Sequence, residues 1–236
     1  MRNFREAVII MKKELRGLFT TPVAYIVMTI FLIATGFFFF KDYFYFNQAE
    51  MRNFFQLLPL IFTFVVPAVT MRLFSEEKQS GSLEILLTLP VTTYNAVLGK
   101  FLAAAAFLSL MLVPTLFYVV TVQLTGSPNY GPIIGGYIGA VLLGASYCAI
   151  GVLTSSLSKN QIIAFITAWA GCFFLWLIDK ITVFIPARLV FLEYLGSDFH
   201  FRNIERGVLD SRDLIYFLSI MAISLILTVR VIDERR

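Results

Sequence analysis

The sequence predicts an all-α, polytopic membrane protein with six transmembrane helices, and three observations support this fold class. Of the 236 residues, 58% are hydrophobic and only 14% are charged, whereas an ordinary soluble domain carries roughly 25% charged residues. Six segments are long and apolar enough to cross a bilayer, which takes about 20 residues in a helix. These segments are continuously apolar, whereas strands of a β-barrel would alternate. The composition therefore excludes a soluble enzyme and a disordered chain.

A basic segment at residues 2–19 precedes the first apolar segment and has helical spacing. Its apolar residues recur at intervals of four and three: Phe4, Val8, Met11, Leu15 and Leu18. This pattern predicts an amphipathic helix in the cytoplasmic membrane interface, with its basic side chains near anionic headgroups. A simpler alternative is that the basic residues only fix the orientation of the chain.

The predicted spans are residues 23–40, 54–71, 101–122, 132–153, 161–178 and 214–229. Prolines at Pro59, Pro67 and Pro114 predict kinks in the second and third spans. The fourth span carries glycines at a spacing that allows close helix packing, which favours packing within the chain over a dimer contact. Cys148 and Cys172 fall within spans, so we expect small packing residues rather than a disulfide. Residues 1–236 are predicted to form one domain.

The distribution of lysine and arginine predicts the orientation. With six spans both termini share one side, and that side holds 12 of the 19 basic residues, against 7 on the other. Because cytoplasmic loops are enriched in lysine and arginine, both termini are expected in the cytoplasm. The net charge of +4 is therefore a topology signal and does not predict nucleic-acid binding.

The loop 179–213 is the longest on the predicted outer side, and we expect two short interfacial or re-entrant helices in it. Asp210 or Ser211 is expected to cap the sixth span. His200 lies in this loop near several acidic residues, but one imidazole with scattered carboxylates is a weak metal-site pattern. We therefore predict no metal ligands and expect His200 at the surface.

Several kinds of chemistry are missing from the sequence. The pair Gly99-Lys100 lacks the earlier glycine and the following Ser or Thr of a phosphate-binding loop, so the chain is not expected to hydrolyse ATP. No ionisable residue falls at the middle of a span, which disfavours a proton-driven transporter. A channel is disfavoured because no span has a polar stripe. No catalytic, cofactor-binding or metal-binding residue is predicted.

The loop 72–100 between the second and third spans is the most informative segment. Glu76, Glu77 and Lys78 end the second span, and Gly81 permits a sharp turn. A short helix at 83–89 follows and is ended by Pro90. Its leucines line one face: Leu83, Leu86 and Leu87. These leucines either pack against the chain's own bundle or bind a groove on a soluble partner.

Residues 76–90, EEKQSGSLEILLTLP, resemble the signature E-E/R-K-x-x-G-T/S-L-E-x-L-L-x-x-P of type-two ABC exporter permeases. Six spans, a basic N-terminal helix and a long outer loop also agree with this family. The segments PAVTMRLFSEEK, SSLSKNQIIAF and RGVLDSRDLIYF are similar to the gliding-motility and nitrous-oxide-reductase-maturation permeases. The resemblance covers essentially the whole chain.

The resemblance implies a permease subunit that carries no catalytic chemistry of its own. This subunit would move substrate across the cytoplasmic (inner) membrane of a prokaryote. Two copies of a cytoplasmic ATPase subunit would bind ATP and Mg, and a second permease subunit, identical or homologous, would complete the transporter. Membrane lipids and an extracytoplasmic accessory protein are further implied partners. The alternative is a membrane scaffold for an ATPase-driven assembly or gliding-motility complex that transports nothing.

The resemblance also implies that residues 83–89 form the coupling helix, which seats in the ATPase subunit. The leucines would be its anchors, and Glu77 and Glu84 would meet basic residues of that partner. The expected ATPase-coupling residues are Glu76, Glu77, Gly81, Leu83, Glu84, Leu86, Leu87 and Pro90.

Overall fold

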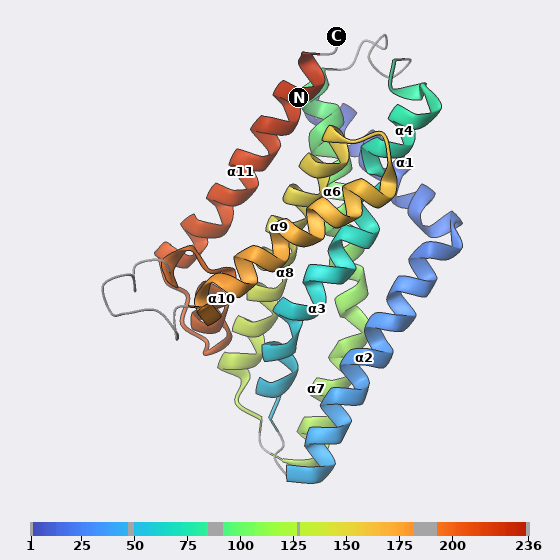
Figure 1. Ribbon diagram of the computed structural model, residues 1–236. Helices are drawn as coiled ribbons and strands as arrows, with labels where there is room; N and C mark the ends of the chain where they lie inside the picture. The colour runs from blue at the N-terminus through green and yellow to red at the C-terminus, as the bar shows by residue number, and fades with distance from the viewer. Residues whose placement is uncertain (1, 47–49, 85–91, 127, 182–192, 235–236) are drawn as a thin grey trace.

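The computed structural model describes residues 2–46, 50–84, 92–126, 128–181 and 193–234. Within these ranges the longer regular elements are all helices, which confirms the predicted all-α fold (Figure 1). In chain order they are α1 (Arg2–Thr20), α2 (Pro22–Phe46), α3 (Arg52–Thr70), α4 (Arg72–Ser80), α6 (Thr93–Leu112), the 3₁₀ turn η1 (Val113–Thr115), α7 (Leu116–Thr125), α8 (Tyr130–Leu157), α9 (Gln161–Ile181), α10 (Ser197–Glu205) and α11 (Ser211–Asp233).

Six stretches of these helices are long and apolar enough to cross a membrane, as predicted. They are Pro22–Lys41, Arg52–Ser80, Thr93–Thr125, Tyr130–Leu157, Gln161–Ile181 and Ser211–Asp233. The loop expected at residues 72–100 is shorter in the structure, because α4 extends the second span to Ser80 and α6 begins at Thr93. The polar residues at these helix ends hydrogen-bond to neighbouring helices, so the helices continue beyond the apolar stretches. Apolar content alone does not reveal such contacts.

The spanning helices form an interior set and a peripheral set. Buried residues make up 61%, 61% and 67% of the most apolar windows in the spans built on α3, α6 and α8, but only 17–22% of those in α2, α9 and α11. The peripheral helices therefore present large apolar faces away from the core, including Ile30 of α2, Ile166 of α9 and Ile223 of α11.

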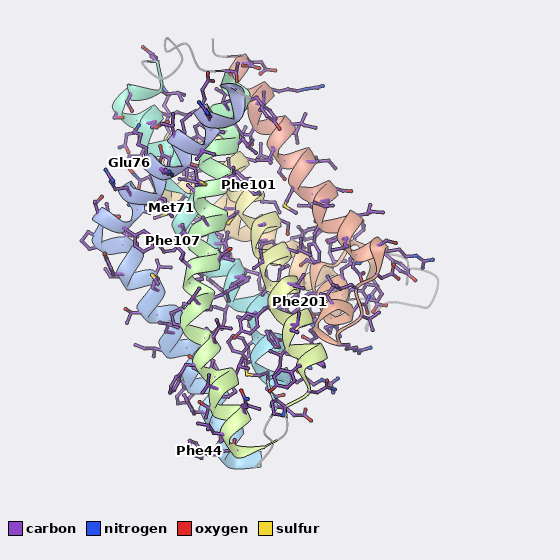
Figure 2. All side chains as sticks on the ribbon, turned by 180° about the vertical axis from the view of Figure 1, so that it is seen from behind. Phe44, Met71, Glu76, Phe101, Phe107 and Phe201 are labelled. Carbon is purple, nitrogen blue, oxygen red and sulfur yellow. The ribbon has the colours of Figure 1, made fainter. Side chains whose placement is uncertain are left out.

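The start of α1 and the finish of α11 lie at the same end of the bundle, together with α4 and the beginning of α6 (Figure 1). We call this the terminal end. Figure 2 shows Glu76 near the terminal end and Phe44 at the opposite end. In Figure 1, α10 lies beside the bundle at roughly half its height rather than beyond the opposite end.

Two spans are interrupted, and one of the two breaks falls at a predicted position, Pro114. Met71 separates α3 from α4, and its backbone N–H donates to the carbonyl of Pro67 at 2.9 Å. Pro114 lies in η1, where the third span tightens into a 3₁₀ turn before continuing as α7. Because a proline lacks a backbone donor, the break at Pro114 is expected, whereas Pro59 and Pro67 lie inside α3, which continues past both.

The glycines of α8 allow close packing within the chain, as predicted. A Cβ added to Gly136 would lie 2.5 Å from the Phe55 ring, and one on Gly151 would lie 2.0 Å from Thr70 Oγ1. Both positions contact α3, so the interior helices approach more closely than any larger residue would allow. Cys148 and Cys172 are buried and free, consistent with their expected packing role.

The described part of the loop 179–213 contains α10 and, just before it, a short 3₁₀ turn at residues 193–195. Asp210 caps the following helix by accepting from the backbone N–H of Arg212 at 3.0 Å. The other short helix was expected in residues 181–195, most of which, 182–192, lie outside the described residues.

Candidate functional site

The polar junction between α1, α4 and α6 at the terminal end is the candidate functional site. Helix α1 lies against α6, and the Asn95 side chain donates to Glu6 Oε2 at 2.8 Å. A Cβ on Gly99 would lie 2.8 Å from the Ala7 carbonyl oxygen, so the glycine permits this close approach. The buried side chains of Ala7 and Leu18 show that part of the apolar side of α1 packs on protein, while Ile9 is 66% exposed.

Lys100 joins the three helices. Its side chain is 1% exposed, and Nζ lies 2.8 Å from Glu77 Oε1 of α4 and 3.1 Å from Glu14 Oε1 of α1. The ammonium also donates to the Leu73 carbonyl at 2.7 Å and lies 5.0 Å from the centre of the Phe74 ring. An ammonium has three donors, and each one has an acceptor here.

The charged side chains of this junction pack between the helices, and they also line a cavity. A cavity of about 290 Å³ lies between the same helices. Its lining includes Lys13, Glu14, Arg72, Glu76, Glu77 and Lys100. Because a buried charge is costly unless it is paired, Lys100 depends on Glu14 and Glu77 remaining in place.

The beginning of α4 is held by a residue of α8. Phe74 and Ser75 donate their backbone N–H groups to Ser155 Oγ at 3.0 and 3.1 Å. Ser155 Oγ in turn donates to the Met71 carbonyl at 2.8 Å. The first N–H groups of a helix have no partner within it, and Met71 supplies no side-chain cap. Ser155 therefore caps α4 from a neighbouring helix.

The described coupling residues have different surroundings. Glu76 and Glu84 are exposed, and Glu76 pairs with Arg72 at 3.5 Å, whereas Glu77 is partly buried and pairs with Lys100. Gly81 has φ of 75° and ends α4 in the left-handed conformation that favours glycine. Leu83 is buried in the chain's own hydrophobic core.

The remaining predicted coupling residues, Leu86, Leu87 and Pro90, lie outside the described residues. Sequence reasoning did not find Glu14, Asn95, Lys100 or Ser155 as site residues. The available signal was a single lysine within the extended third span, together with acidic residues in two flanking helices. Their pairing joins positions 23 and 86 residues apart, which local patterns do not show.

His200 is buried, which corrects the expectation of a surface residue. It is 5% exposed, its Nδ1 lies 2.5 Å from Asp213 Oδ1, and its Nε2 lies 2.9 Å from the Tyr194 carbonyl. Both ring nitrogens therefore have an oxygen partner within the chain. The histidine thus ties α10 to α11. Among the described residues, no three His, Cys, Asp or Glu side chains group as metal ligands would.

A second ion-pair cluster ties α10 to the end of α9. Arg202 pairs with Asp179, and its Nε lies 3.1 Å from Asp198 Oδ2. Lys180 pairs with both of these aspartates. The carboxylates and the cations compensate one another, so this cluster positions α10 against the bundle.

Six spanning helices with a polar junction at one end define a multi-pass membrane protein. The family model described as ABC-2 family transporter protein matches residues 8–194, more than three quarters of the chain, and the chain belongs to this family. It is therefore a permease subunit of an ABC transporter, the membrane part that works with an ATP-binding subunit. A comparison with curated proteins finds no match.

Proposed function

We propose that this permease is an exporter subunit, and that a separate ATPase subunit powers it by hydrolysing ATP. Two ATPase copies and a second permease subunit complete the proposed transporter in the cytoplasmic membrane of a prokaryote. The terminal end faces the cytoplasm in this proposal, and residues 76–90 contact the ATPase. The likeness of the segments PAVTMRLFSEEK, SSLSKNQIIAF and RGVLDSRDLIYF to gliding-motility and nitrous-oxide-reductase-maturation permeases supports placing the chain near those groups.

The Lys100 junction carries this proposal. Glu77 belongs to the predicted coupling segment, and Lys100 connects it to α1 and α6 through contacts of 3.1 Å or less. A force applied to residues 76–90 would therefore move three helices together. Exposed Glu84 is available to meet basic residues of the ATPase, and so is exposed Glu76, whose carboxylate also pairs with Arg72 of the same helix at 3.5 Å.

The charge of α1 supports the proposed orientation. Arg5, Lys12, Lys13 and Arg16 are all exposed, so they can lie near the anionic headgroups of the cytoplasmic leaflet. Because the other side of α1 packs on α6, the helix would serve both as a membrane-surface helix and as part of the coupling end.

The peripheral apolar faces support a second permease subunit. Helices α2 and α9 expose several large apolar side chains away from the core, and a bundle of this kind can bury such a face against lipid or a second subunit. A transport path between two subunits would also need fewer polar residues within each one. Crosslinking in native membranes, with the ATPase present, is expected to give a permease dimer; monomer alone would count against this arrangement.

The coupling proposal is tested by replacing Leu86 with Asp. If Leu86 anchors the coupling helix, a charge there must be desolvated on binding, and truncating an anchor alone costs about 2 kcal/mol. The ATPase subunit is therefore expected to be lost from pull-downs, while membrane insertion stays normal. Thr88→Asp is the matched control in the same segment. Normal insertion with undiminished ATPase binding and coupled hydrolysis would overturn the assignment.

A further inference from the structure

A second cavity, of about 610 Å³, lies at the opposite end of the bundle, far from the Lys100 junction. It lies between residues 50–51 just before α3, residues 128–129 just before α8, and Glu205 and Arg206 at the end of α10. Its size falls within the range of small-molecule sites, roughly 300–1,000 Å³. The residues that matter for its chemistry are Arg52, Phe55, Val122, Ile133, Glu205 and Arg206.

Glu205 is the unusual group in this wall. It is 5% exposed, and its Oε2 atom has no hydrogen-bond partner among the described residues. The pKa of Glu205 is raised to about 7, chiefly by burial and in smaller part by the charge of Asp198, although a hydrogen bond from Gln56 and the charges of Arg52 and Arg202 oppose this rise. A buried acceptor without a partner is costly, so a donor group entering the cavity would be stabilised.

The rest of the lining contains both charge signs and an apolar wall. Arg52 and Arg206 are exposed cations, and Glu50 adds a second carboxylate. Phe55 and Ile133 are buried apolar residues of the same wall. A ligand that carries a cation, an anion and an apolar part would satisfy all three kinds of surface.

We propose that this cavity binds a zwitterionic phospholipid with a primary ammonium headgroup. The ammonium donates to Glu205, the phosphate contacts Arg52 and Arg206, and the apolar wall contacts the glycerol and acyl region. A phospholipid is the ligand class available to a chain that crosses a membrane. A trimethylammonium headgroup carries the same charge but has no N–H donor, so the cavity discriminates against it.

The test is native mass spectrometry of the purified permease from micelles containing equal amounts of phosphatidylethanolamine and phosphatidylcholine. The wild-type chain is expected to retain phosphatidylethanolamine about tenfold more, the size of a charge-assisted hydrogen bond. Glu205→Gln is expected to bring this ratio close to one. Glu193→Gln is the matched control, because Glu193 belongs to the same outer loop but not to the cavity.

A second variant separates the phosphate contact from the ammonium contact. Arg206→Gln is expected to lower the retention of both lipids and to keep their ratio, because Arg206 is exposed and contacts the phosphate. Arg212→Gln, also exposed but outside the cavity, is the control. Added soluble phosphoethanolamine is expected not to displace the lipid; displacement would assign the site to the free headgroup and overturn the lipid assignment.

The pH dependence tests the wild-type chain alone. Ionised Glu205 is needed to accept from the ammonium, so the preference is expected at about pH 8 and lost at about pH 5.5. Equal retention of the two lipids at about pH 8, or an unchanged ratio in a folded Glu205→Gln chain, would overturn the proposal. Neither result bears on the coupling proposal, which concerns the other end of the molecule.

Discussion

Lys100 shows how a buried charge is retained in this chain. Its ammonium has three acceptors, contributed by α1 and α4. At the other end Glu205 is buried with one oxygen lacking a partner among the described residues. The two residues are both charged and buried, but only Lys100 has every hydrogen-bonding group satisfied. Their substitution should therefore have opposite effects on stability.

Lys100→Met is expected to destabilise the permease by about 3 kcal/mol, because it leaves Glu14 and Glu77 without their shared cation. The measurement is thermal unfolding of the purified chain in detergent, with coupled ATPase activity in the assembled complex. Lys13→Met is the control, since Lys13 is exposed beside the same cavity. Equal unfolding temperatures for both variants would contradict the structural role of Lys100.

Glu205→Gln is expected to change how stability depends on pH. The pKa of Glu205 is raised from 4.5 to about 7 in the folded chain, so folding favours its protonated form. The contribution of this group is therefore full below pH 4.5 and declines as pH rises towards 7. Gln does not titrate, so the variant should gain roughly 5–10 °C in relative melting temperature over this interval. Melting curves of the lipid-free chains at matched pH measure this difference, and a pH-independent difference would contradict it.

The helices differ in how well the sequence predicts them. The spans are recognisable because membrane insertion depends on the apolar content of one continuous segment. The length of the second helix was missed because Arg72, Glu76 and Lys78 make α4 polar, although it continues the span to Ser80. The break at Met71 and the cap from Ser155 depend on contact with α8, so no pattern within α4 predicts them.

Gly151→Ala tests the close contact of α8 with α3. Its new Cβ would lie 2.0 Å from Thr70 Oγ1, so the helices must separate, and overpacking of this kind costs about 2 kcal/mol. Gly171→Ala is the control, because its Cβ would lie at an ordinary 3.6 Å from Ile150. Thermal unfolding should show a lower midpoint for the first variant only. A stable Gly151→Ala chain would show that α3 and α8 can move apart at little cost.

The arrangement of the spans in the whole molecule could not be predicted from their composition. The interior spans have mean hydropathy of 2.0, 2.2 and 1.8, and the peripheral spans have 2.3, 2.0 and 2.3. These values overlap, because a membrane helix is apolar whether it faces lipid or protein. The small residues of α8 were the useful signal, since glycine allows the close approach that an interior helix needs. The buried site at Lys100 depends on three separate segments and was therefore missed.

Cysteine substitution tests the proposed orientation. Glu50→Cys lies between α2 and α3 at the opposite end, and Ser80→Cys lies at the terminal end; both positions are exposed. Native Cys148 and Cys172 are buried, so background labelling should be low. A membrane-impermeant thiol reagent added to intact cells is expected to modify Glu50→Cys and to reach Ser80→Cys only after permeabilisation. The reverse pattern would place the terminal end outside.

The hydroxyl of Ser155 has a mechanical consequence. It holds three backbone groups of the α3–α4 junction, at 2.8, 3.0 and 3.1 Å, and a hydroxyl can donate only once. One oxygen therefore restrains α4 against tilt in more than one direction. Met71 would be a compliant point if it stood alone, because it interrupts the helix. With Ser155 in place the junction is stiff. A displacement of α4 therefore moves α8 and bends the bundle, and is not absorbed at Met71.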